Sequence, residues 1–365
     1  MMRVIAAFII CLLLTGCWDQ TQLKKLLFVD VVGLDYAGDS KQIQLNYVIS
    51  SLREASQGGG KPSGLFVQSI GGTLYDAVNN TNKEMPGVLN TLETRLYLIS
   101  NRFAKDDPLS YLNSTAQFIS NPLYAYLAVY DGDLPKLLAK KKVKNLTVAD
   151  FLVGILDEEK KRGRIPTNKL LHLILGGTEF LNDFALNRFE PYGEEARLAG
   201  TALFSDGKYT GVNLDNEETQ LAYLLEGAKG RNQFFFSQAE DKKFSALLLN
   251  AKRKFHILST SESVREIIIS LKLDLKLVED GNGSKNYTKK IMNDLEKTIT
   301  ADLTVKSAKV IATLQKANCD YLQLGHEVAA YHPNLYKAMN WREQYPKLKI
   351  KPIVKVRILN TGIVE

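Results

Sequence analysis

The clearest pattern in the chain is a strict alternation of apolar and polar residues around position 270. The apolar residues occupy the odd positions: Ile267, Ile269, Leu271, Leu273, Leu275 and Leu277. The even positions between them include Lys272, Asp274 and Lys276. Because successive side chains of a strand point to opposite faces, this alternation predicts a strand with one buried side and one side in water.

A longer period follows this strand and predicts a helix over residues 287–318. Its apolar residues recur at helical spacing: Ile291, Leu295, Ile299, Leu303, Val310, Ile311 and Leu314. This spacing places them on one face of the helix. Near the C-terminus, apolar Val354, Val356 and Ile358 alternate with Lys355 and Arg357. That segment predicts a last strand with a basic face.

The first 190 residues alternate between strand-like and helix-like segments. Strands are predicted over 28–35, 42–50 and 93–103, and helices over 73–83, 108–120 and 148–162. Residues 36–40 favour a turn, so the first two strands should form a hairpin. The continuous apolar run over 123–130 suits a strand buried on both faces. Together these elements predict a sheet covered by helices.

The middle of the chain has a different pattern. Residues 189–193, Phe-Glu-Pro-Tyr-Gly, predict a linker. After it, residues 199–209 predict a hairpin that turns at Asp206-Gly207. A helix over 217–225 can be capped by Asp215 or Asn216. Two further strands are predicted at 233–237 and 244–251.

We therefore expect an α+β protein of three consecutive domains behind a short leader. The expected boundaries are a signal peptide at 1–16, an N-terminal domain at 17–192, a middle domain at 193–252 and a C-terminal domain at 253–365 that contains the long helix. Each domain should hold a mixed or antiparallel sheet with flanking helices.

The leader has the composition of a lipoprotein signal peptide. One cation, Arg3, precedes an apolar run of 11 residues from Val4 to Leu14. A bilayer-spanning helix needs roughly 20 apolar residues, so the run is too short to be a membrane anchor. It ends in Leu14-Thr15-Gly16-Cys17, which resembles a bacterial lipobox. We expect cleavage before Cys17 and a diacylglyceryl group on its sulfur; a plain secreted protein with an incidental cysteine is the alternative.

Composition narrows the possible functions. The chain has 365 residues, of which 45% are hydrophobic and 24% charged, as in ordinary folded proteins. Its net charge of +7 is spread over a long chain and does not indicate a nucleic-acid partner. There are three cysteines, and two of them fall in the leader. A disulfide framework and a cysteine-based zinc site are therefore excluded.

Motifs of enzyme chemistry are missing from the sequence. The four histidines, His172, His256, His326 and His332, have no metal-site spacing. There is no nucleophile elbow and no nucleotide-binding glycine motif. Thr73 after two glycines predicts a helix cap rather than an anion site. Cys319 has no local base and predicts a small buried apolar residue. We expect no catalytic residue, cofactor or metal.

Several blocks of the mature chain resemble one family. The lipobox runs into Cys17-Trp18-Asp19, and the first strand ends in Gly33-Leu34-Asp35. This opening resembles the Ger(x)C family, the lipoprotein C subunits of spore nutrient germinant receptors. Later blocks agree in order: Thr94 to Ala104, Gly200 to Gly211, and Asp320 to Gly325 followed by Trp341 and by Asn360 to Gly362. The chain departs from the family pattern over 116–124 and at Leu324-Gly325-His326.

The resemblance implies three α+β domains and a non-enzymatic, lipid-anchored receptor subunit required for germination in response to nutrients. It implies contacts with two integral membrane subunits of A and B type, on the outer face of the spore inner membrane. It does not assign germinant binding to this subunit or name the germinant. The alternative is a solute-binding lipoprotein of a membrane transporter.

Overall fold

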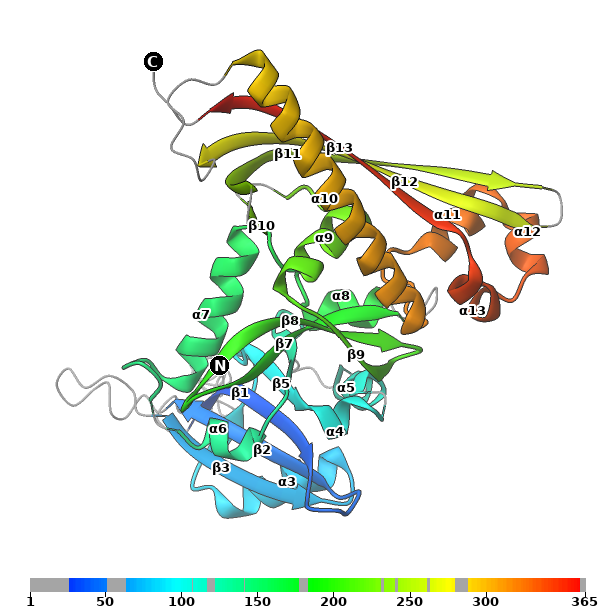
Figure 1. Ribbon diagram of the computed structural model, residues 1–365. Coiled ribbons are helices and arrows are strands. Elements are labelled where there is room, and N and C mark those ends of the chain that lie inside the picture. Colours follow the sequence, from blue (N-terminus) through cyan, green and yellow to red (C-terminus); the bar gives the residue numbers. More distant parts are fainter. Residues whose placement is uncertain are drawn as a thin grey trace, which may run out of the picture.

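The computed structural model describes residues 26–50, 64–106, 108–116, 122–140, 142–176, 183–230, 233–239, 242–260, 263–279 and 288–361 (Figure 1). The leader with Cys17 lies outside the described residues. The described strands form two sheets, which confirms the mixture of strands and helices.

The first sheet is built from residues 26–214. Its strand order is β3-β2-β1-β5-β6-β7-β8-β9, and β4 pairs with β1 beside this path. The strands are β1 (Leu26–Tyr36), β2 (Ile43–Ser50), β3 (Gly64–Gly71), β4 (Val88–Asn90), β5 (Leu96–Ser100), β6 (Tyr126–Tyr130), β7 (Phe184–Tyr192), β8 (Glu195–Ser205) and β9 (Lys208–Leu214). β1, β5, β6 and β7 run parallel, whereas both ends of the sheet are antiparallel. The sheet is therefore mixed, and the expected hairpin of β1 and β2 is confirmed.

Helices cover both faces of the first sheet. They are α3 (Leu74–Glu84), α4 (Asn101–Ala104), α5 (Pro108–Ala116), α6 (Leu134–Leu138), α7 (Val148–Lys161) and α8 (Leu170–Gly176). Apolar residues of α3, α4 and α5 share one buried cluster with the sheet, and those of α6 and α7 share another. The central strand β6 is buried at every position, as its continuous apolar run predicts.

Side-chain caps determine where two of these helices begin. The Thr73 hydroxyl accepts the Asp76 N–H, which confirms the cap expected before α3. Ser100 plays the same part for α4, because its hydroxyl accepts the Phe103 N–H at 3.2 Å. The strand expected to reach residue 103 therefore ends at Ser100.

The second sheet has the order β10-β11-β12-β13. Its strands are β10 (Phe234–Ala239), β11 (Lys242–Ser259), β12 (Val264–Glu279) and β13 (Ile350–Thr361). The helices near it are α9 (Asn216–Glu226), α10 (Lys289–Lys316), α11 (Leu324–Tyr331), α12 (Pro333–Ala338) and α13 (Trp341–Gln344), followed by a 3-10 turn, Tyr345–Lys347. The long helix α10 crosses one face of the sheet (Figure 1).

The alternation in β12 is confirmed with one exception. The six odd positions from 267 to 277 are at most 1% exposed, and they pack in one cluster with α9 and α10. On the other face, Lys272 is exposed, but Asp274 is buried. Its carboxylate accepts Arg357 Nε at 3.0 Å and Asn250 Nδ2 at 3.3 Å. The expectation that Asp274 lies in water is wrong because these two neighbours cover it.

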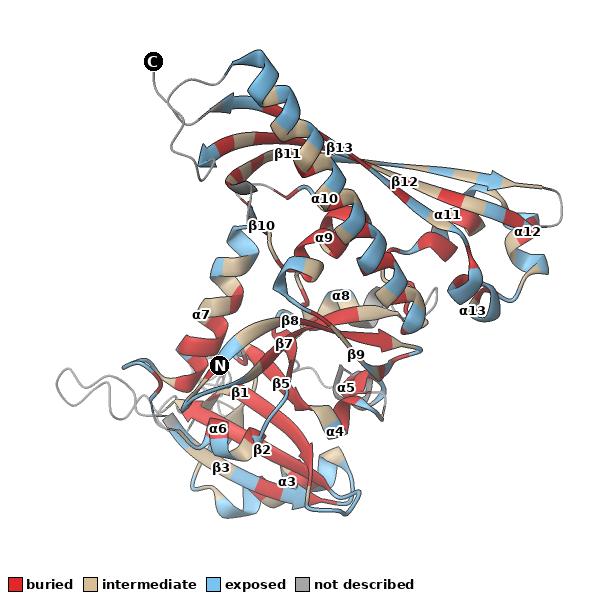
Figure 2. Ribbon diagram, in the orientation of Figure 1, coloured by how far each residue is buried: buried red, intermediate tan, exposed pale blue. Residues whose placement is uncertain are grey.

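Neither expected internal boundary coincides with the division between the two sheets. Residues 189–193 are not a linker: β7 continues to Tyr192, and Gly193 sits in the β7–β8 turn with φ of 57°. Position 252 lies inside β11. One buried cluster extends from Leu203 and Leu214 of the first sheet through α9 to the second sheet (Figure 2). The three-domain division stays a prediction.

No helix in the described part of the chain is long and apolar enough to cross a membrane.

Candidate functional site

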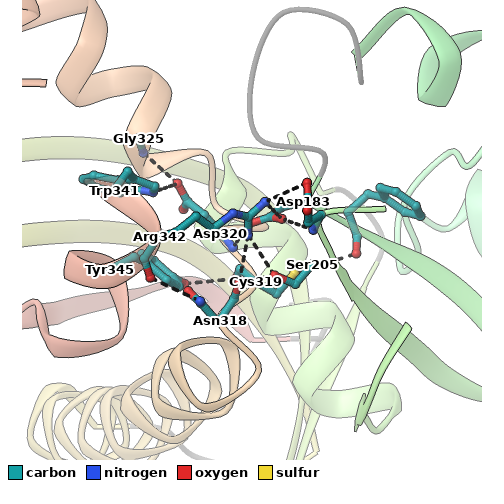
Figure 3. Close-up of polar contacts among 11 residues, drawn as sticks. Asp183, Ser205, Asn318, Cys319, Asp320, Gly325, Trp341, Arg342 and Tyr345 are labelled. Atoms are coloured by element: carbon teal, nitrogen blue, oxygen red, sulfur yellow. Dashed lines mark hydrogen bonds and ion pairs between the residues drawn. The ribbon is translucent and has the colours of Figure 1, made fainter. Parts of the chain in front are cut away.

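A buried polar cluster joins the first sheet to the C-terminal helices (Figure 3). Its residues come from the segment just before β7, the end of β8, the loop from α10 to α11, the first turn of α11, and α13 with its following turn. We call this cluster the junction; it comprises Asp183, Ser205, Asn318, Cys319, Asp320, Gly325, Trp341, Arg342 and Tyr345.

Asp183 and Arg342 form the central ion pair of the junction. Arg342 Nη1 donates to Asp183 Oδ2 at 2.8 Å, and Nη2 lies 2.7 Å from Oδ1. The Asp183 side chain is 2% exposed and also accepts the backbone N–H groups of Asp206 and Asp320. Both carboxylate oxygens thus have partners, as a buried acid requires.

Arg342 reaches further partners on both sides of the junction. Its Nη1 donates to Ser205 Oγ at 2.8 Å and to the Asn318 carbonyl at 3.2 Å. The Ser205 hydroxyl donates to the same carbonyl at 2.6 Å. Asn318 has a left-handed φ of 47°, which asparagine tolerates better than most residues. One guanidinium therefore ties the end of β8 to the end of α10.

Asp320 organises the beginning of α11 from within the junction. Its Oδ1 accepts the Leu324 N–H at 2.9 Å, and its Oδ2 accepts the Gly325 N–H at 2.7 Å and Trp341 Nε1 at 3.0 Å. A Cβ added at Gly325 would come within 2.8 Å of Trp341 Nε1, so only glycine fits there. The spacing of aspartate, glycine and tryptophan noted in the sequence thus corresponds to one hydrogen-bonded unit.

Cys319 and Tyr345 complete the buried interior of the junction. The Tyr345 hydroxyl donates to the Cys319 carbonyl at 3.0 Å. Cys319 is fully buried, which confirms the expectation of a small buried apolar residue. Burial raises the pKa of its thiol well above the ordinary value, so the reactive thiolate is disfavoured.

Electrostatics also point to a structural site. Burial raises the pKa of the Asp320 carboxyl to about 7, and the Gly325, Leu324 and Trp341 donors act in the opposite direction. Asp320 is 4% exposed and is enclosed by these donors. The polar groups of the junction bind one another, and their arrangement holds the C-terminal helices against β7 and β8.

A second polar contact, on the surface, joins the helices α9 and α10. Lys306 Nζ lies 2.6 Å from Glu217, and Lys309 Nζ lies 2.9 Å from Glu218. Both glutamates belong to the first turn of α9, where Asp215 forms a capping box with Glu218. The cap that the sequence predicted is confirmed, and it also faces α10.

The first sheet carries a separate polar crevice of about 480 Å³. It lies at the carboxyl ends of the parallel strands β1, β5 and β6, a common location of ligand sites in such sheets. Asp35, Arg102 and Asp131 are among its lining residues. Two of these already pair with each other: Arg102 Nη2 lies 3.1 Å from Asp35.

The structure brings some of the candidate residues together and leaves others apart. Asp320, Gly325 and Trp341 meet in the junction, whereas the four histidines lie in or beside α8, β11 and α11. Among the described residues no group of three or more side chains could hold a metal ion. Asp183 and Arg342 were missed, because 159 positions separate them and neither belongs to a local motif.

The sequence matches two known domains of spore germination proteins, one after the other. The chain matches the spore germination protein N-terminal domain over residues 19–188 and the spore germination B3/GerAC-like C-terminal domain over residues 199–362. The two matches meet in the β7–β8 hairpin, within the first sheet. The chain is thus a spore germination protein.

Several curated proteins resemble the chain over nearly its whole length. Spore germination protein B3 of Bacillus subtilis (strain 168) is 22% identical over 98% of this chain and 97% of its own length. Spore germination protein KC of the same strain is 21% identical over 96% and 93%. Spore germination protein GerQC of Bacillus cereus is 20% identical over 100% of both chains.

The crystal structure of the GerBC protein has the same fold. It superposes with a TM-score of 0.59 at 15% identity, covering 94% of this chain and 100% of that one. The chain belongs to the GerAC/GerBC-like family of spore germination C subunits. Members of this family are generally non-enzymatic.

Proposed function

We propose that the chain is the lipid-anchored C subunit of a nutrient germinant receptor, required for germination in response to nutrients. The observation that carries the proposal is the match to both family domains in order, over residues 19–188 and 199–362. The subunit acts through contacts with the integral membrane A- and B-type subunits and not through catalysis. No nucleic acid takes part.

The junction suits a receptor subunit that transmits a signal to its partners or holds them in position. It fastens the C-terminal helices to the first sheet through a buried ion pair and several short hydrogen bonds. Buried polar networks rigidify the elements they join and favour one arrangement of them. A receptor subunit of this kind presents its surfaces to its partners in a fixed relative orientation.

The anchor is expected at Cys17, on the outer face of the spore inner membrane. The leader ends in Leu14-Thr15-Gly16-Cys17, and two acyl chains give stable attachment where one is marginal. We expect Cys17→Ala to abolish lipid labelling and to release the protein from membranes or leave it unprocessed. Its thermal unfolding should be unchanged, because the three buried apolar clusters are built from residues after Leu26.

Fractionation of sporulating cells, together with metabolic labelling by a fatty acid, measures both effects. Cys319→Ala is the matched cysteine control and should keep its label and its membrane fraction. A Cys17→Ala protein that still carries the lipid label and still sediments with membranes would show that Cys17 is not the lipid anchor.

A solute-binding lipoprotein of a transporter is the second candidate function. The polar crevice beside Asp35 and Asp131 is the feature that favours it. Calorimetric titration of the purified chain with amino acids and sugars tests the candidate. Submicromolar binding of one such compound, lost in Asp131→Ala, would favour the transporter function over the receptor function.

A further inference from the structure

The outer face of the second sheet carries a continuous band of cations. In one row across the sheet, Lys252 of β11, Lys272 of β12 and Lys355 of β13 are direct neighbours. Lys254 lies one row away on β11, and Lys351 lies beyond it on β13. All five lysines are exposed. We call these residues the basic face.

The described helices leave the basic face uncovered. Helix α10 packs on the opposite side, against the odd positions of β12 and against Val354, Val356 and Ile358. Helices α9 and α11 contribute to that same buried cluster. Within the described part of the chain, Lys252, Lys272 and Lys355 form no ion pair with a carboxylate. Figure 2 shows α10 lying across one side of these strands.

Stability of the sheet does not account for the row of lysines. Like charges directly opposite one another on neighbouring strands are destabilising. Lysines do protect exposed sheet edges, and Lys252 lies on β11 beyond the stretch that pairs with β10. Lys272, however, lies on β12, which pairs with β11 on one side and with β13 on the other. On the edge strand β13, helix α10 already supplies protection: Thr300 accepts the Val356 N–H at 3.2 Å, and Glu296 accepts the Ile358 N–H at 2.7 Å.

We propose that the basic face binds the anionic headgroups of a lipid bilayer. The unpaired cations of the face are lysines, which are depleted at the centres of protein interfaces, and its one arginine, Arg357, is paired with Asp274. A compact ammonium on a flexible stem suits diffuse attraction to a charged surface. Two exposed apolar side chains on the same face, Ile353 and Leu359, can enter the headgroup region.

The lipid tether and the basic face then act as two attachments to one surface. Stable anchoring of a protein commonly combines acyl chains with a polybasic patch. The tether holds the chain near the bilayer, and the face sets which side of the second sheet meets it. This orientation rests on the proposed lipid anchor, whereas binding of the face to anionic lipid does not.

Vesicle co-sedimentation of the unacylated chain 17–365 tests the proposal independently of the anchor. That chain retains every described residue. We expect it to bind vesicles containing phosphatidylglycerol, to ignore pure phosphatidylcholine vesicles, and to dissociate as salt is raised. Lys252→Glu/Lys272→Glu/Lys355→Glu should lower the affinity by more than about a hundred-fold, because losing each lysine near an anionic surface costs about five-fold and each glutamate adds repulsion.

The matched control reverses the charge of three lysines that lie outside the basic face. Lys83→Glu/Lys160→Glu/Lys208→Glu alters exposed lysines of α3, α7 and β9 and should keep the affinity within a few-fold. The neutral triple change to Gln at 252, 272 and 355 should give an intermediate loss. Thermal unfolding confirms that each variant is folded.

Three outcomes would overturn the proposal. One is equal binding to both vesicle types, and another is equal loss in the control variant. The third is a chain that ignores all vesicles but loses capture by the detergent-solubilised A- and B-type subunits when the three lysines are reversed. That result would assign the face to a protein partner.

Discussion

Leu273→Asp is expected to prevent the second sheet from folding. The side chain is fully buried in the middle of β12, and truncating such a leucine to alanine alone costs about 2–5 kcal/mol. Aspartate adds a buried carboxylate. The residues directly opposite, Ala251 and Val356, are apolar and offer it no cation. The total approaches the roughly 5–15 kcal/mol that stabilises a whole domain.

Lys272→Asp is the matched control, one position earlier on the same strand. It points to the solvent face, between Lys252 and Lys355, so we expect a change of about 0.5 kcal/mol or less in the free energy of unfolding. Thermal and urea unfolding of the chain 17–365 with each change measures the difference. If Lys272→Asp were as damaging as Leu273→Asp, the sheet would be buried on both faces.

Arg342→Ala is expected to lower the free energy of unfolding by about 3 kcal/mol. It leaves the buried Asp183 carboxylate without its counterion. Ser205 Oγ and the Asn318 carbonyl also lose the hydrogen bond that each accepts from Arg342. The loss is at the lower end for a broken buried pair, because Asp183 keeps the N–H groups of Asp206 and Asp320.

An exposed ion pair provides the comparison. Arg197 bonds Glu190 at 2.6 Å, but its side chain is 57% exposed, so Arg197→Ala should cost about 1 kcal/mol or less. Urea unfolding of both variants tests the difference. Arg342→Ala should also cost less in an Asp183→Asn background. Equal effects of Arg342→Ala and Arg197→Ala would show that the junction does not hold the two halves together.

Local patterns in the sequence predicted many of the elements. The alternation in β12, the caps at Thr73 and Asp215 and the long helix α10 each depend on residues close in sequence. The hairpins β1–β2 and β8–β9 follow from short turn segments. In each case the chemistry that determines the element lies within a few residues of it.

The features that depend on distant residues were not predicted. Burial of Asp274 depends on Arg357, 83 positions away. The pairing of β7 with β8 makes residues 189–193 part of a hairpin, although proline and glycine there resemble a linker. The sequence pointed to Asp320, Gly325 and Trp341 as a block, but not to the ion pair of Asp183 and Arg342 beside them.

Affinity purification of the full chain from membranes of dormant spores tests the central claim most directly. We expect two integral membrane proteins of the A and B receptor types to co-purify with the wild-type chain. Co-purification of these two proteins should fall in Cys17→Ala, which is no longer attached to the membrane, and should stay unchanged in Cys319→Ala. Recovery of the chain with the permease and ATPase of a transporter, and without the receptor subunits, would contradict the account.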